Sequence, residues 1–301
     1  MIVQIYEIQD PHEAERCIEA GVNHIGSVIL SETEWKNPEI REVVRLSKGS
    51  GAKNSIIPLF KKIDTLYSIL DYYRPDFIHF CDTLTDGYGK DIILDELVGL
   101  QSNIRERFPE VLIIRSIPIP VNLPEQGFPT IEISERFEEL TDYFLTDTWL
   151  GKEPVEGFIG ITGKTCDPGI ARELVSHSRI PVILAGGLSP ENVYESILNI
   201  LPSGADSCTQ TNLKDSSGRT IRFKKDFKRV RRFVEEVRRA EQAVEDKRKK
   251  IQKEILELRL QLRDREEALP AHSVRPHQIQ IIEELEDQIA SKEEELAGLP
   301  V

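Results

Sequence analysis

The chain has 301 residues, of which 39% are hydrophobic and 30% are charged, and its formal net charge is -13. This composition provides one large apolar core and excludes a membrane-spanning protein, since no apolar run approaches the roughly 20 residues that a transmembrane helix needs. The first ten residues predict a strand rather than a signal peptide, and the four cysteines form no CxxC pair, so we expect a cytoplasmic protein without a disulfide framework.

Short apolar runs alternate with amphipathic segments through most of the chain. Strands are predicted over Ile2–Ile8, His24–Leu30, Ser55–Phe60, Asp76–Cys81, Val111–Pro118, Tyr143–Asp147, Pro181–Ala185 and Ala205–Cys208. Helices are predicted over Pro11–Ala20, Pro38–Ser47, Thr65–Tyr73, Asp91–Arg107, Ser134–Asp142, Pro168–His177, Pro190–Asn199 and Phe223–Arg239. Alternation of this kind favours a parallel sheet covered by helices. Eight units favour an α/β fold of the closed (βα)8 TIM barrel type, although periodicity alone leaves an open doubly wound sheet possible.

After about residue 230 the pattern is typical of a coiled coil. Apolar residues recur seven apart in two rows, Val237, Val244, Ile251 and Leu258, then Ile255, Leu262 and Leu269. Pro270 ends this helix, and a second one follows. Its apolar face carries Ile282, Leu285, Ile289 and Leu296. We therefore expect a barrel over residues 1–239 and an antiparallel helical hairpin over 240–301, with 240–298 forming a surface for a homodimer or a protein partner.

Charge is distributed unevenly over the last third of the chain. Residues 219–265 are rich in Lys and Arg, whereas residues 266–298 are rich in Glu. Pairing of the two helices across their seam explains this better than nucleic-acid contact, so no nucleic-acid partner is expected. His272 and His277 flank the turn and could bind a metal, but capping and packing is the favoured interpretation. We expect no metal and no cofactor.

Three turns are suited to a phosphate group, and barrels of this class carry their chemistry in the turns that follow the strands. In the first, Gly160 and Gly163 expose the backbone amides, Lys164 and Thr165 add a charge and a hydroxyl, and Thr162 is a further expected phosphate ligand. The second turn contains Gly186 and Gly187, and the third contains Cys208 and Thr209. A glycine-rich turn can also serve only as a connection, but three in succession favour a bound phosphorylated small molecule.

The segments Gly160–Asp167 and Leu184–Val193, together with the strand end at Asp206, resemble the phosphoribosylanthranilate isomerase family. Ala20–Gly26 resembles the entry into that family's second strand. The resemblance covers roughly residues 2–235 and implies a barrel that rearranges a phosphoribosyl amine in tryptophan biosynthesis. In such a reaction an acid opens the furanose ring and a base then removes the C2′ proton. Asp147 stands at the place of the family's acid, although a strand-end aspartate can also merely cap a turn.

The sequence departs from the family at the base. Tyr6 replaces the family's cysteine, and a phenol with a pKa near 10 is a poor base at neutral pH. Glu7, beside the lost base, and Cys81, on the same strand face as His79, are substitute candidates, although a buried cysteine is more often inert. Strand-end residues that could line the mouth, or be solvated instead, are Asp82, Arg115 and Ser116.

Three further departures affect the anthranilate and base end of the site. Gln4 replaces the lysine before the base, and the arginine of the loop after the second strand is missing from Ser31–Lys36. Gln210–Asn212 also replaces the Gly-Val-Glu that follows the eighth strand in the family. Three hypotheses remain: an isomerase-type enzyme for another phosphorylated sugar-type substrate, the isomerase itself with a relocated base, or a non-catalytic phosphometabolite-binding scaffold that acts through its hairpin.

Overall fold

The computed structural model describes residues 1–86, 89, 94–122, 127–270 and 275–300. The chain divides into two compact units, Met1–Arg238 and Arg239–Val301. The first unit contains every strand of the described chain. The second unit consists of the end of one long helix and the helix that follows it.

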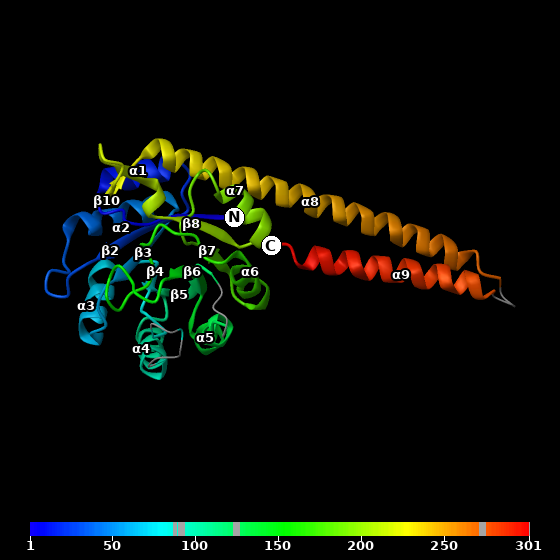
Figure 1. Ribbon diagram of the computed structural model, residues 1–301, viewed down its shortest axis with the longest axis horizontal. Helices are drawn as coiled ribbons and strands as arrows, with labels where there is room; N and C mark the ends of the chain where they lie inside the picture. The colour runs from blue at the N-terminus through cyan, green and yellow to red at the C-terminus, as the bar shows by residue number, and fades with distance from the viewer. Residues whose placement is uncertain (87–88, 90–93, 123–126, 271–274, 301) are drawn as a thin grey trace. The chain divides into compact units, whose positions relative to one another are not determined.

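Eight parallel strands of the first unit close into a barrel, in which each strand pairs with the next and the last pairs with the first (Figure 1). The strands are β1 (Ile2–Ile5), β2 (His24–Ile29), β3 (Lys53–Pro58), β4 (Phe77–Phe80), β5 (Leu112–Pro120), β6 (Tyr143–Trp149), β7 (Val182–Leu184) and β8 (Gly204–Ser207). The predicted (βα)8 TIM barrel is therefore confirmed, and the open sheet is excluded.

Seven helices follow the first seven strands and cover the barrel from outside (Figure 1). They are α1 (Pro11–Glu19), α2 (Pro38–Ser50), α3 (Ile63–Tyr73), α4 (Leu94–Arg107), α5 (Thr130–Phe137), α6 (Pro168–His177) and α7 (Val193–Ile200). Three of them begin with an N-cap side chain followed by proline at the first helical position, which satisfies exposed amides and presets the backbone. These caps are Asp10, Asn37 and Asp167. The predicted start of α4 at Asp91 lies outside the described residues.

Two predicted helices were placed wrongly. The one predicted over Ser134–Asp142 is α5 from Thr130, continued by a 3-10 turn over Glu138–Leu140. The one predicted from Phe223 begins only at Phe227, because the preceding residues form an antiparallel pair of strands, β9 (Asn212–Lys214) and β10 (Thr220–Lys225). Asp215 closes the turn between these strands by accepting hydrogen bonds from the backbone of Ser217, at 2.9 Å, and Arg219, at 3.0 Å.

Alternate side chains of each barrel strand face the interior. Most of these are apolar and form one core with Tyr6, Val28, Ile57, Phe77, Cys81, Ile114, Leu145, Ile159, Ile183 and Ala185. Arg115 faces the opposite way and is buried against Phe80 and Phe137, where it donates to Asp82 at 2.8 Å. Neither Arg115 nor Asp82 lines the mouth of the barrel, because each satisfies the other's charge behind the strands.

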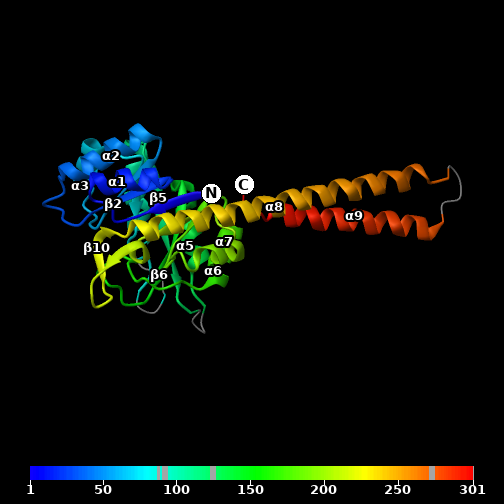
Figure 2. The ribbon, with the colours of Figure 1, turned by 90° about the horizontal axis from the view of Figure 1, so that it is seen from above.

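The second unit is an antiparallel hairpin made by the end of α8 (Phe227–Glu267) and by α9 (Pro276–Ala297), which lie side by side in Figure 2. Its buried seam contains Ile251, Ile255, Leu285 and Ile289. Cross-seam ion pairs join Lys247 to Glu295, Glu254 to Lys292 and Arg259 to Glu293. The hairpin and its charge pairing are as predicted, although α8 ends at Glu267 rather than Leu269. No helix in the described ranges is long and apolar enough to cross a membrane.

Candidate active site

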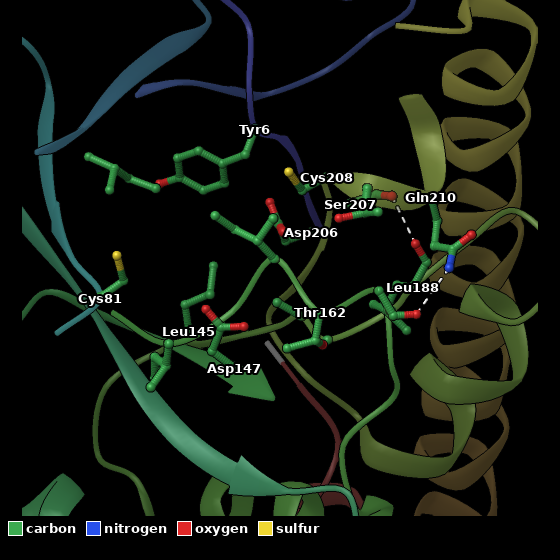
Figure 3. A pocket seen from close by; sticks show the side chains of 18 of the residues that line it. Tyr6, Cys81, Leu145, Asp147, Thr162, Leu188, Asp206, Ser207, Cys208 and Gln210 are labelled. Carbon is green, nitrogen blue, oxygen red and sulfur yellow. Dashed lines mark hydrogen bonds between the residues drawn. The ribbon is translucent and has the colours of Figure 1, made fainter. Parts of the chain in front are cut away.

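A cavity opens where the barrel strands end, with about 700 Å³ of space not filled by protein atoms. Every barrel strand except β5 contributes to its lining, either directly or through the turn that follows it. Figure 3 shows Tyr6 and Cys81 on one side of this cavity, and Thr162 and Gln210 on the other. Its lining is mostly apolar with a few polar groups, a composition that is typical of small-molecule sites.

Two carboxyl groups face the cavity. Burial raises the pKa of Asp147 to about 7, and the charge of Glu153 adds to the effect. Burial likewise raises the pKa of Asp206 to about 8, with a contribution from the charge of Asp147. Within the described part of the chain, Oδ1 of Asp206 is buried without a hydrogen-bond partner. Near neutral pH the pair therefore retains a proton that it can donate.

Asp206 was expected only as part of a phosphate turn. Strand alternation places it on the same face as Cys208, since the two are two residues apart, and both line the cavity. Strand alternation could therefore have predicted that Asp206 faces the same cavity as Asp147. The raised pKa could not be predicted in this way, because it depends on how many apolar neighbours surround both groups.

A chain of hydrogen bonds crosses the barrel from Tyr6 to Asp147. The Tyr6 hydroxyl lies 2.8 Å from Oγ of Ser55 and 2.6 Å from Nδ1 of His79. Nε2 of His79 lies 2.8 Å from Oγ of Ser116, which donates to Oδ2 of Asp147 at 3.4 Å. The sequence placed these residues at strand ends but did not connect them, because their contacts depend on which strands become neighbours.

In this hydrogen-bond chain, the phenol of Tyr6 and the imidazole of His79 are both uncharged at neutral pH. Burial raises the pKa of Tyr6 well above its usual value of about 10. Burial and the charge of Arg115 lower the pKa of His79 to about 3. Tyr6 is therefore not a preformed phenolate base, and His79 does not carry a positive charge into the cavity.

Gly26 on β2 makes room for the Tyr6 ring. A Cβ atom at Gly26 would lie 1.9 Å from Cδ1 of Tyr6, a distance that no real contact tolerates. In this chain, therefore, any side chain at Gly26 would displace the aromatic ring at the base position.

The three predicted phosphate turns lie in contact. A Cβ atom at Gly187 would lie 2.6 Å from the backbone carbon of Lys164, so the second turn passes directly beneath the first. The third turn reaches the first through Gln210, whose side-chain amide donates to the carbonyl of Gly163 at 3.0 Å. The turn residues that line the cavity are Thr162, Gly163, Gly186, Gly187, Cys208 and Thr209.

Gly160 and Lys164 do not line the cavity. Gly160 has a φ of 98° and lies against Asp147, whose Oδ2 would be 2.5 Å from an added Cβ atom. The Lys164 side chain is exposed, and its backbone carbonyl accepts a hydrogen bond from Oγ1 of Thr148 at 2.7 Å. Gly160 thus gives the acid its space, and Lys164 shapes the turn through its backbone.

The two substitute bases differ in location. Glu7 lies outside the cavity lining, where Nε of Arg222 donates to it at 2.6 Å and Nδ2 of Asn212 at 2.8 Å. Burial opposes ionisation of Glu7, but these two partners outweigh it and lower the pKa. Cys81 lines the cavity, yet burial raises the pKa of its thiol well above 9. Glu7 is removed from the reacting groups, and Cys81 is a neutral thiol.

No family model matches the chain. It is 35% identical over 150 residues to N-(5'-phosphoribosyl)anthranilate isomerase 2 of Methanosarcina mazei, covering 47% of this chain and 60% of that relative. The corresponding isomerase of Methanosarcina acetivorans is 26% identical over 238 residues, or 76% and 90% of the two chains. Among solved structures, phosphoribosyl anthranilate isomerase from Thermotoga maritima shares the fold, with a TM-score of 0.58 and 21% identity over 79% of this chain and 99% of that one.

Proposed function

We propose, from the premise that this chain is a divergent relative of the phosphoribosylanthranilate isomerases, that its barrel isomerises a phosphorylated sugar-type amine from aldose to ketose. The observation that carries this proposal is a pair of carboxyl groups with raised pKa in a cavity bordered by three glycine-rich or polar turns. A pure binding protein has no use for buried acids that titrate near neutrality, so an enzyme is favoured over a scaffold.

Asp147 is the proposed general acid. It lies on β6 beside the phosphate turns and retains its proton up to a pH of about 7. In an Amadori rearrangement this proton goes to the furanose oxygen as the ring opens. A neighbouring group then removes the proton from C2′, which gives an enolamine and finally the ketose.

The proposed phosphate subsite consists of Thr162, Gly163, Gly186, Gly187 and Thr209, with the backbone of Cys208 beside them. Glycine amides approach a phosphate oxygen closely because no Cβ atom intervenes. Ile161, between Gly160 and Thr162, has a φ of 59°, which is strained for a β-branched residue. Strain of this kind is typical of turns held in one conformation for binding.

Part of the cavity lining is apolar. It contains Val28, Ile57, Leu59 and Leu145, and no lysine or arginine is found in the lining that the structure describes. A carboxylate on the organic half of the substrate would lack a cation there. We therefore propose an uncharged organic group rather than anthranilate.

The test is turnover of phosphoribosyl amines that carry either a neutral aryl group or anthranilate, followed by ³¹P NMR of the sugar phosphate. Conversion of the neutral amine to the ketose is expected, with Asp147→Asn inactive. If no phosphorylated sugar amine is converted or raises the melting temperature, the proposed function is wrong.

We also propose that residues 1–239 suffice for the reaction, in the cytoplasm, and that 240–298 bind a second copy or a protein partner. The cysteines are all free thiols, which suits a reducing compartment. Exposed apolar side chains on the hairpin, Leu256, Leu260 and Ile279, support an interaction surface.

A further inference from the structure

The hydrogen-bond chain of Tyr6, His79 and Ser116 connects the position of the missing base to the acid Asp147. We propose that this chain is a proton relay, which allows Asp147 to act first as the acid and then, through the relay, as the base toward the same substrate. The inference rests on the proposed function and names how its second proton transfer occurs. His79 and Ser116 act through their neighbours and are positioning residues, whereas Tyr6 meets the substrate.

Proton counting fixes the direction of every hydrogen bond once Asp147 is ionised. A carboxylate cannot donate, so Ser116 donates to Asp147, and Oγ of Ser116 must accept the proton of His79 Nε2. A neutral imidazole carries one proton, so Nδ1 of His79 accepts from the Tyr6 hydroxyl. Tyr6 in turn accepts from Ser55. Every hydrogen bond in the chain therefore donates in the direction of the Asp147 carboxylate, and each group in it has a partner.

The transfer step balances. Asp147 has given its proton to the ring oxygen, and the C2′–H bond then breaks, with its electron pair forming the double bond of the enolamine. The C2′ proton goes to the oxygen of Tyr6, while the Tyr6 proton moves to Nδ1 of His79. The Nε2 proton moves to Ser116, and the Ser116 proton moves to Asp147. Each member again holds one proton, and His79 now carries its proton on Nδ1. It returns to the Nε2–H form, by proton exchange with water, once Asp147 has again given its proton to a ring oxygen.

This route avoids the obstacles that the other candidate bases meet. A phenolate at Tyr6, an imidazolium at His79 and a thiolate at Cys81 would each place a charge in a site whose burial opposes it. In the relay none of these groups becomes charged. The proton ends on Asp147, the carboxylate that the first step has just created.

Among the described residues, few titratable groups lie near this hydrogen-bond chain. The charge of Asp147 raises the pKa values of Asp206, Cys81 and Cys166, and the charge of Glu153 raises the pKa of Asp147 itself. The pKa of Tyr6 is raised further by the charges of Asp206, Cys81 and Cys208, and the pKa of His79 is lowered by the charge of Arg115. Asp206 has a pKa of about 8, near the value of about 7 for Asp147, so an Asp206→Asn background removes the overlapping titration.

The kinetic test compares His79→Gln with a matched control, His24→Gln. His24 is also buried inside the barrel, where its Nδ1 lies 3.1 Å from Oε1 of Gln4, but it does not line the cavity. We expect kcat to fall at least about 100-fold in His79→Gln, with KM within about threefold, and to stay within about threefold in His24→Gln. In mixtures of H2O and D2O, the wild-type rate should curve with deuterium content, since several protons move together.

A near-normal kcat in His79→Gln, or a straight proton inventory in the wild type, would overturn the relay. A second measurement needs no substrate: ¹⁵N NMR of the imidazoles in the full-length Asp206→Asn protein. His79 should stay neutral and change from the Nε2–H to the Nδ1–H tautomer as Asp147 takes up its proton, and Asp147→Asn should abolish the change. A fixed tautomer refutes the relay, whereas absence of any turnover refutes only the proposed function.

Discussion

At the scale of single residues, the two acids of the cavity make the protein sensitive to pH. Asp147 and Asp206 have pKa values of about 7 and 8 in the folded protein, against an ordinary value of 3.8. The folded state therefore holds protons that the unfolded state has already lost. Their contribution to stability is complete below the ordinary value of 3.8, and it is lost progressively as the pH rises from there through the two folded values.

We predict that the melting temperature falls by roughly 5 °C between pH 6.5 and pH 8. Below pH 6.5 the melting temperature should level off, because burial lowers the pKa of His24 and of His79 to about 4 and 3, and the protons that these two histidines take up on unfolding offset those of the two carboxyls. Calorimetry of the unliganded protein measures both effects. In Asp147→Asn/Asp206→Asn the fall above pH 6.5 should disappear, whereas the exposed Glu283→Gln should keep it; a fall of the same size in the double variant would contradict the assignment.

The catalytic role of Asp147 gives a separate prediction. Asp147→Asn should lower kcat by about 10² to 10⁴-fold, because an amide cannot donate the proton that opens the ring. Its affinity for the substrate should change little. In the wild type, kcat/KM should decline above a pH of about 7, as the acid loses its proton. Full activity of the variant in steady-state assays would remove Asp147 from the reaction.

At the scale of elements, the turns after β6, β7 and β8 form one structure rather than three. Gly187 can lie beneath the backbone of Lys164 only because it has no side chain, and its φ of 59° also favours glycine. The charge of Lys164 matters less here than the path of its backbone.

Gly187→Ala should therefore weaken binding of a phosphate ester by more than about tenfold, whereas Lys164→Ala should weaken it by less than about fivefold, since an exposed charge contributes about 1 kcal/mol or less. Gly51→Ala is the matched control: its φ is 84°, but an added Cβ atom meets nothing within 4 Å. It should lower stability and leave affinity unchanged. Titration calorimetry decides between these outcomes, and equal losses in Gly187→Ala and Lys164→Ala would refute the backbone role.

The elements of the barrel were predictable because strands and helices have different apolar periods. The pair β9 and β10 was not, since Thr220–Lys225 is short, charged and directly followed by a long helix. In the site, alternation placed Cys81 and His79 on the interior face, and the family resemblance placed Tyr6 at the base position; all three line the cavity. Alternation could not place Glu7, whose φ of 63° interrupts it, nor the contacts of His79, which form between strands distant in sequence.

At the scale of the whole molecule, the hairpin keeps apolar side chains outside its own seam. Leu256 and Leu260 lie one helical turn apart on α8 and are 59% and 44% exposed, and Ile279 on α9 is 46% exposed. Two exposed leucines on one face of α8 are typical of a contact surface. A second copy of the hairpin offers the same residues in return.

We predict that the full-length protein dimerises through this surface, and that Leu256→Glu/Leu260→Glu is monomeric in sedimentation velocity runs. Gln252→Glu/Gln261→Glu adds the same charge at exposed positions of α8 and should remain dimeric. Both variants should keep the activity of the barrel. A monomeric wild type at all concentrations would leave the surface to another protein.

The contact between Gly26 and the Tyr6 ring also constrains how this sequence can change. A descendant cannot gain a side chain at position 26 while the aromatic ring is in place, because the two would occupy the same space. The ring at position 6 has to be lost first. In the same way, the tyrosine could arise only in a lineage that already had the glycine.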